Sequence, residues 1–197
     1  NFELWPLAGV QALVLQHLDD PDEATQRAAI WNAGEMKIST ARPRLLEMVV
    51  SGPDVIRAEA AQAIGKLGNQ ETARTTLERR LSEESSPTVL VGLLRGLALI
   101  KSPLSIEAAL PLTNHADASV MLHAFWVLRN SGETSLRPML HAELAKKPTG
   151  QRLCALLDTV KMVAKPEDVT WARRQFQVVD KEAKCDRVVW EERNERQ

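Results

Sequence analysis

Aromatic residues are scarce in this chain of 197 residues. It contains five Trp, three Phe and no Tyr, together 4% of the sequence, whereas Leu and Ala recur throughout. Sheets favour aromatic and β-branched residues, and Leu and Ala favour packed helices. With 44% hydrophobic and 26% charged residues the chain has the composition of an ordinary folded protein. The shortage of aromatics therefore favours an all-α domain.

An excess of charge of either sign is also lacking, since the formal net charge is −1. A partner held by overall charge alone, such as nucleic acid or an acidic membrane, is disfavoured, although a local basic patch stays open. No apolar run approaches the roughly 18 residues that a membrane-spanning helix needs. No signal peptide is visible either. We expect no membrane association.

Cysteine is limited to Cys154 and Cys185, which lie 31 residues apart. Neighbouring packed helices lie about 8–10 Å apart, farther than the roughly 7 Å that a disulfide spans between Cα atoms. We therefore expect two free thiols. Free thiols suit a reducing compartment, so the expected location is the cytoplasm.

What the sequence does have is internal repetition, with a period near 32 residues. Pro21-Asp22 is followed by Ala28-Ala29, and Pro53-Asp54 is followed at the same offsets by Ala60-Ala61. Further copies begin at Pro87, Asp117 and Gly150. The predicted units are residues 20–51, 52–85, 86–116, 117–148 and 149–180, preceded by a partial unit or cap at 1–19 and followed by a C-terminal cap helix at 181–197.

Each unit is predicted to be a helix, a tight turn and a second helix. In the second unit Ile56, Ala60 and Ile64 fall on one helical face, Gly68 provides a stop, and a second apolar stripe follows. In the third unit the second helix is expected to carry Ile106 and Leu110.

Proline marks the predicted helix starts. Pro21, Pro53 and Pro87 each follow a small or polar residue, and proline is favoured at the first position of a helix. We therefore expect these three prolines to be the first residues of their helices.

Helix pairs this short cannot bury their apolar faces alone, so neighbouring units must stack into a solenoid. The stretch from Pro53 to Asn69, PDVIRAEAAQAIGKLGN, resembles the short bacterial HEAT repeat that is also found in phycobilisome-lyase-like proteins. The resemblance extends over residues 20–148 and more loosely beyond them. It implies one all-α domain over residues 1–197, a right-handed α-solenoid of about five HEAT-like helix pairs with a macromolecule-binding surface. Because the chain begins with Asn1 and half a unit, we expect further repeats before it.

Motifs for catalysis, metals and nucleotides are absent from the sequence. The four histidines, His17, His115, His123 and His141, form neither an HExxH pair nor a zinc-type Cys/His cluster. HEAT-like metal hydroxylases carry His-Glu dipeptides, and this chain has none. Gly-rich phosphate loops and the G-x-S-x-G elbow are missing too. We expect no catalytic residues, no metal and no cofactor.

Two tryptophans have polar neighbours one helical turn away: Glu35 follows Trp31, and Arg129 follows Trp126. A tryptophan with an acid resembles the arrangement in some HEAT-like DNA glycosylases. The alternative is that Trp31 and Trp126 fill space in the core or between repeats. We favour this packing interpretation, because large aromatic side chains usually serve packing.

Basic residues recur on the predicted second helices, which usually line the concave side of HEAT-like solenoids. They could form a groove for phosphate or for an acidic protein. Acidic residues such as Glu47, Glu71 and Glu78 are interspersed among them, which favours a mixed solvated face. The candidate binding residues are Arg42, Arg44, Arg74, Arg137, Trp31 and Glu35.

Three functional hypotheses follow. The favoured one is a non-catalytic scaffold or adaptor that binds a protein or peptide with the solenoid surface. The second is a HEAT-like nucleic-acid-binding protein, with or without glycosylase activity through Trp31 and Glu35. The third, which rests on the family resemblance alone, is a bilin-lyase-like chaperone for a chromophore-bearing partner.

Overall fold

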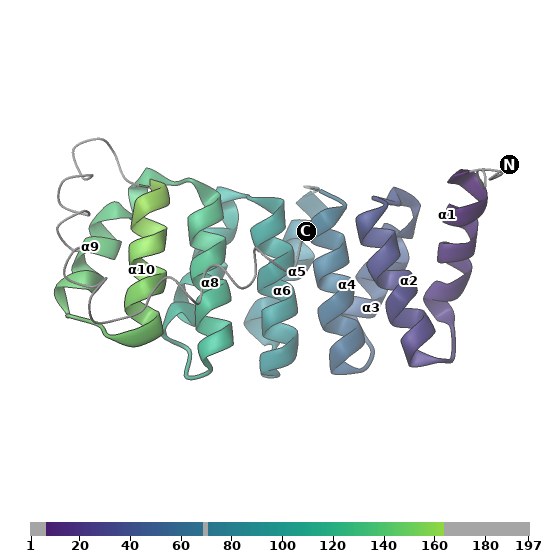
Figure 1. Cartoon of the computed structure of the whole chain (residues 1–197), viewed down its shortest axis with the longest axis horizontal. Helices are drawn as coiled ribbons and strands as arrows, with labels where there is room; N and C mark the ends of the chain where they lie inside the picture. The colour runs from purple at the N-terminus through teal and green to yellow at the C-terminus, as the bar shows by residue number, and fades with distance from the viewer. Residues whose placement is uncertain (1–6, 69–70, 164–197) are drawn as a thin grey trace, which may run out of the picture.

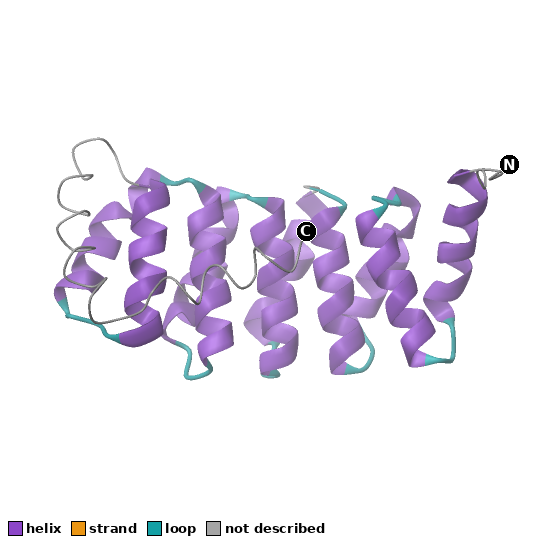
Figure 2. Cartoon of the chain, viewed as in Figure 1, coloured by secondary structure: helices purple, strands orange, loops and turns teal. Residues whose placement is uncertain are grey.

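A computed structural model of the chain describes residues 7–68 and 71–163. Within these ranges the chain is helical and has no strand (Figure 2), which confirms the predicted all-α fold. The helices are α1 (Leu7–Gln16), α2 (Glu23–Glu35), α3 (Arg42–Val50), α4 (Asp54–Lys66), α5 (Glu71–Glu83), α6 (Pro87–Ile100), α7 (Ile106–Ala109), α8 (Ala118–Ser131), α9 (Arg137–Ala145) and α10 (Gly150–Val163). None of them is long and apolar enough to cross a membrane.

The helices form two layers. Helices α2, α4, α6, α8 and α10 stand side by side in one layer, with α3, α5 and α9 behind them (Figure 1). Each helix of the first layer contacts the next one, while α3 packs on α4, α5 on α6 and α9 on α10. The predicted solenoid of stacked helix pairs is therefore confirmed.

The first-layer helices are amphipathic, with one side buried in the core and the opposite side exposed. On α2, Ile30 and Ala33 are buried, whereas Arg27, Trp31 and Glu35 are exposed on the opposite side. We call this exposed side of the first layer the outer face. It lies away from the second helices, so side chains on it are free of the core.

The backbones of α4 and α6 touch through small residues. A Cβ atom at Gly96 would lie 2.4 Å from the carbonyl oxygen of Ala61, and one at Gly92 would lie 2.4 Å from the Cα atom of Ala58. Real Cβ atoms do not approach other atoms so closely, so any larger side chain at these two positions would push the helices apart.

The predicted role of proline is correct at one of its three positions. Pro87 is the first residue of α6, with Ser86 as its cap. Helix α2 begins only at Glu23, because the Asp22 carboxylate accepts a hydrogen bond of 2.8 Å from the backbone N–H of Thr25 and so caps the helix after Pro21. Pro53 is likewise the cap residue before α4. The prediction is wrong for these two prolines.

The second helix of the third unit is broken into short pieces. A 3-10 turn, η3 (Pro103–Ser105), leads into the four-residue α7, and a second one, η4 (Leu110–Asn114), follows it. Pro111 has no N–H to donate, and its ring clashes with a preceding helical carbonyl. The single helix predicted to carry Ile106 and Leu110 therefore ends at Ala109.

Two sequence predictions concern the C-terminal part of the chain. Cys154 lies buried in α10 and is disulfide-bonded, so the expectation of a free thiol is wrong for this cysteine. The expected location in the cytoplasm therefore has no support from free thiols. Cys185, the second helix of the fifth unit and the predicted cap at 181–197 lie outside the described residues.

The close contact between α4 and α6 predicts that a Gly→Ala substitution lowers the free energy of unfolding at one position and raises it at another. Gly96→Ala should lower the free energy of unfolding by roughly 1–3 kcal/mol, because the added methyl group collides with backbone. Gly9→Ala in α1 meets nothing within 4 Å and should raise it by about 0.5–1 kcal/mol. Urea unfolding followed by circular dichroism measures both. Equal effects of the two substitutions would contradict the contact.

Lysine occupies a left-handed backbone position where neighbouring repeats have glycine. Lys101 follows α6 with φ 56°, as Gly132 follows α8 with φ 69°. Lys101→Gly should raise the free energy of unfolding by about 0.5–1 kcal/mol, because relief of the backbone strain exceeds the entropic cost of glycine. Lys161→Gly inside α10 should lower it by about 1 kcal/mol. Thermal unfolding of both variants decides the matter, and a loss of stability in Lys101→Gly would refute the expectation.

Candidate functional site

Arg42, one of the predicted binding residues, donates hydrogen bonds to the backbone at the end of α4. It is the first residue of α3 and is buried. Its guanidinium donates hydrogen bonds of 3.1 Å to the carbonyl oxygen of Leu67 and 3.3 Å to that of Gly68. These carbonyls follow α4, where a helix leaves acceptors unsatisfied. Arg42 therefore fastens α3 to the end of α4.

The other predicted arginines also have partners within the chain. Arg44 bonds Asp19 at 2.6 Å and Glu47 at 2.7 Å; these two hydrogen bonds, that to Asp19 first, raise its pKa. Arg74 pairs with Glu78 at 2.6 Å. Arg137 is the first residue of α9 and is partly buried. These contacts agree with the mixed face that the interspersed acids predicted, and they show that Arg42, Arg44 and Arg74 each contact carbonyls or carboxylates of the chain itself.

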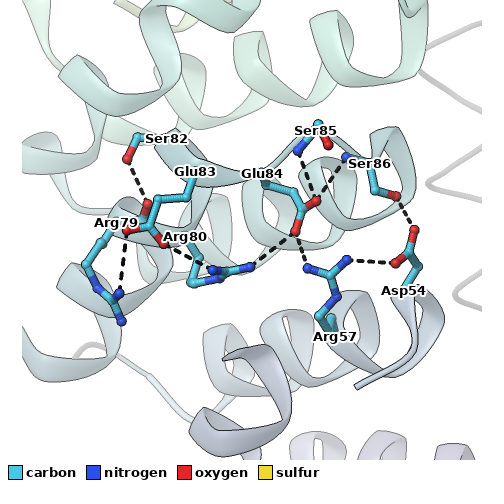
Figure 3. A network of polar contacts seen from close by, with 9 residues as sticks. All are labelled: Asp54, Arg57, Arg79, Arg80, Ser82, Glu83, Glu84, Ser85 and Ser86. Carbon is cyan, nitrogen blue, oxygen red and sulfur yellow. Dashed lines mark hydrogen bonds and ion pairs between the residues drawn. The ribbon is translucent and has the colours of Figure 1, made fainter. Parts of the chain in front are cut away.

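A buried carboxylate, Glu84, joins three helices in the middle of the chain (Figure 3). It accepts backbone hydrogen bonds from Ser85 at 2.9 Å and Ser86 at 3.0 Å, just before α6. It is also ion-paired with Arg57 of α4 and with Arg80 of α5. Burial raises the pKa of Glu84, but the two backbone donors and Arg57 outweigh burial, and the net shift is downward.

On the outer face, Trp31 is an exposed tryptophan rather than a packing residue. The residue is 56% exposed, so the packing interpretation is wrong for Trp31. The Nζ atom of Lys66, on the neighbouring α4, lies 5.6 Å from the centroid of the indole ring and is ion-paired with Glu35. At this distance the ammonium and the ring attract each other. Trp31 and Glu35 thus lie together as predicted, and Lys66 is the member that sequence reasoning missed.

Trp126, in contrast, packs as the sequence predicted. It is partly buried against the core, and its ring meets that of His123 edge to face with 5.9 Å between centroids. His123 in turn accepts a hydrogen bond of 3.0 Å from the guanidinium of Arg95 on α6.

A pocket of about 390 Å³ lies between α4, α6 and the start of α8. Ala58 and Gly92 contribute small residues to its lining, and Glu59, Arg95 and Asp117 contribute charge. Sequence reasoning missed this site. The signal that could have found it is the pair of small residues at similar places in successive first helices, which indicates a close helix contact with little side-chain filling.

The described part of the chain offers no obvious metal site. Within residues 7–68 and 71–163, no three His, Cys, Asp or Glu side chains come together as a metal would require. The chemistry that the outer face supports is noncovalent: an exposed indole ring beside a cation, and a pocket with charged groups around a small-residue floor.

Together the two helical layers and this face define an α-solenoid with an exposed face for contacts. Residues 11–90 match the family model for HEAT repeats. Residues 11–90 thus form HEAT repeats, and the resemblance recognised in the sequence is confirmed. No curated protein sequence matches the chain.

A solved structure with a similar fold is that of the complex of CpcE and CpcF of phycocyanin lyase from Nostoc sp. PCC7120. The match has 20% sequence identity and a TM-score of 0.65, and it covers 85% of this chain and 71% of the other. At this identity the likeness concerns the fold.

The Glu84 network predicts a pH-dependent loss of stability. Glu84→Gln should lower the free energy of unfolding at pH 7 by about 2 kcal/mol, because a 6% exposed carboxylate loses hydrogen bonds to charged partners. The pKa of Glu84 in the folded chain lies below its usual 4.5. The difference in free energy of unfolding between the variant and the wild type should therefore be largest above about pH 4.5. It should disappear as the pH falls further and Glu84 becomes protonated.

The neighbouring Glu83→Gln is the matched control. Glu83 is 45% exposed and makes surface ion pairs only, so its loss should cost less than about 0.5 kcal/mol. Urea unfolding between pH 3 and pH 7 measures both variants. If the two variants lose the same free energy of unfolding, or if the effect of Glu84→Gln persists unchanged at pH 3, the ionised Glu84 carboxylate does not stabilise the fold as described.

Proposed function

We propose that this chain is a non-catalytic scaffold that binds a protein partner, and that the outer face around Trp31 is the contact surface. The observation that carries the proposal is the exposure of Trp31, a residue that is 56% exposed to solvent. Tryptophan is enriched among the residues that dominate protein interfaces, because one ring supplies a large apolar contact and an N–H donor.

The surroundings of Trp31 support the same proposal. The ring is oriented by Lys66, and Lys66 is held by Glu35, so little side-chain freedom is lost when a partner covers it. Ala28 and Ala24, about one and two turns before it on α2, are exposed and small. A partner can therefore lie flat along this helix with the indole as its anchor.

The nucleic-acid alternative has less support. Binding to phosphates needs basic side chains that are free to make new contacts, and Arg42, Arg44 and Arg74 already contact carbonyls or carboxylates of the chain. Glu35, the acid proposed for glycosylase chemistry beside Trp31, is paired with Lys66. Binding to a protein partner does not require free basic side chains.

A second candidate is favoured by one observation, the similarity in fold to a chain of phycocyanin lyase. A bilin-lyase-like chaperone would bind a bilin or a bilin-carrying protein. Adding a bilin to the purified chain and recording visible absorbance and fluorescence tests this candidate, and unchanged spectra at equimolar concentrations would remove it.

Substitution of the exposed tryptophan tests the scaffold proposal. The partner is first identified by cross-linking to the full chain in its own cells, and its affinity is then measured by calorimetry. Trp31→Ala should raise Kd tenfold or more, since a central interface tryptophan is worth about 2 kcal/mol or more.

Leu104→Ala is the matched control, because Leu104 is 66% exposed but lies on η3, away from α2. It should leave Kd within twofold. If Trp31→Ala leaves Kd unchanged, or if Leu104→Ala weakens binding equally, the outer face around Trp31 is not the contact surface.

A further inference from the structure

The pocket between α4, α6 and the start of α8 has a floor made of small and apolar groups. Ala58 and Gly92 meet there, where the two helix backbones touch. Val55 and Val91 stand beside them in the lining. Such a floor suits an unbranched aliphatic chain, which gains by leaving water and needs no polar partner along its length.

Glu59 contributes an acceptor that no group in the described part of the chain satisfies. Its Oε1 atom accepts two hydrogen bonds from Arg27, of 2.9 Å from Nε and 2.7 Å from the terminal nitrogen. Its Oε2 atom is buried and has no hydrogen-bond partner among residues 7–68 and 71–163. A buried, unsatisfied carboxylate oxygen is costly. The carboxylate torsion of glutamate is soft, so a small rotation can turn Oε2 toward a donor in the pocket.

The other charged groups of the lining are already engaged. The Asp117 carboxylate accepts from the backbone N–H groups of Ser119 at 2.8 Å and Val120 at 3.0 Å, which caps α8. Arg95 donates to His123. The buried oxygen left without a donor among these charged groups is Glu59 Oε2, and a carboxylate oxygen attracts cationic donors and repels anions.

We infer that this pocket receives a lysine or arginine side chain of the protein partner, with its aliphatic stem along Ala58 and Gly92 and its cationic head at Glu59 Oε2. The inference rests on the proposed function for the nature of the partner. It adds the partner's chemistry: a basic residue next to the segment that covers Trp31. Glu59 and Arg27 join α4 to α2, the helix that carries Trp31, so one partner can reach both sites.

The test uses the full chain labelled with ¹⁵N and a lysine probe without backbone charges, N-acetyl-lysine N-methylamide. Titration should shift the amide signals of Thr88 and Gly92 saturably with a millimolar Kd, as a single side chain allows. N-acetyl-glutamate N-methylamide should leave these signals in place. Shifts that do not saturate, that arise elsewhere, or that the acidic probe also produces would overturn the inference.

Two variants break the same ion pair and separate recognition from structure. Glu59→Gln removes the charge and should raise Kd for the lysine probe roughly tenfold. Arg27→Ala removes the competing cation and leaves the carboxylate, so Kd should stay the same or fall. If both variants weaken binding alike, the ion pair is structural and the inference is wrong. Neither result depends on Trp31 or on an identified partner, so failure here is distinguishable from failure of the scaffold proposal.

Discussion

The contact of α4 with α6 through small residues is the constraint on which the outer face depends. A helix pair of this length cannot bury its own apolar side, so the repeats must stack, and their spacing follows from what lies between them. Gly92 and Gly96 leave room for the backbone of α4 itself. The same lack of side chains leaves open space above Ala58 and Gly92, which becomes the pocket. The small-residue contact between α4 and α6 thus determines both the spacing of these helices and the presence of the pocket.

Ion pairs between neighbouring first helices determine the character of the face. Arg27 reaches Glu59, Lys66 reaches Glu35 and Arg129 reaches Asp158, each across to the next helix of the layer. Ion pairs near the surface add little stability, because water and salt screen them. Their larger effect is to neutralise the surface they cross. A face whose charges are paired selects a partner by shape and by a few unpaired groups, and this gives weight to an exposed indole ring.

The sequence predicts the helices and their stacking because both follow from local periodicity. Ile56, Ala60 and Ile64 lie on one face in any α-helix, and their recurrence requires stacking. Helix ends were less predictable: Asp22 rather than Pro21 determines where α2 begins, and Pro111 divides a helix whose apolar spacing looked regular. The position of Trp31 could not be predicted, because its neighbour Lys66 comes from another repeat. Which side of a helix faces solvent is decided by packing between repeats.

The difference between Arg42 and Glu59 explains why the candidate site lies on the first helices rather than on the second helices, which carry the predicted arginines. Both are charged residues at regular places in a repeat, and composition alone makes the arginine the better binding candidate. In the folded chain Arg42 donates to two carbonyl oxygens that needed a donor, so a partner would have to replace bonds already made. Glu59 keeps one buried oxygen to which none of the described residues donates, so a partner can supply the missing hydrogen bond. A binding residue is distinguished by what remains unsatisfied after folding, and that property emerges only when neighbouring repeats are in contact.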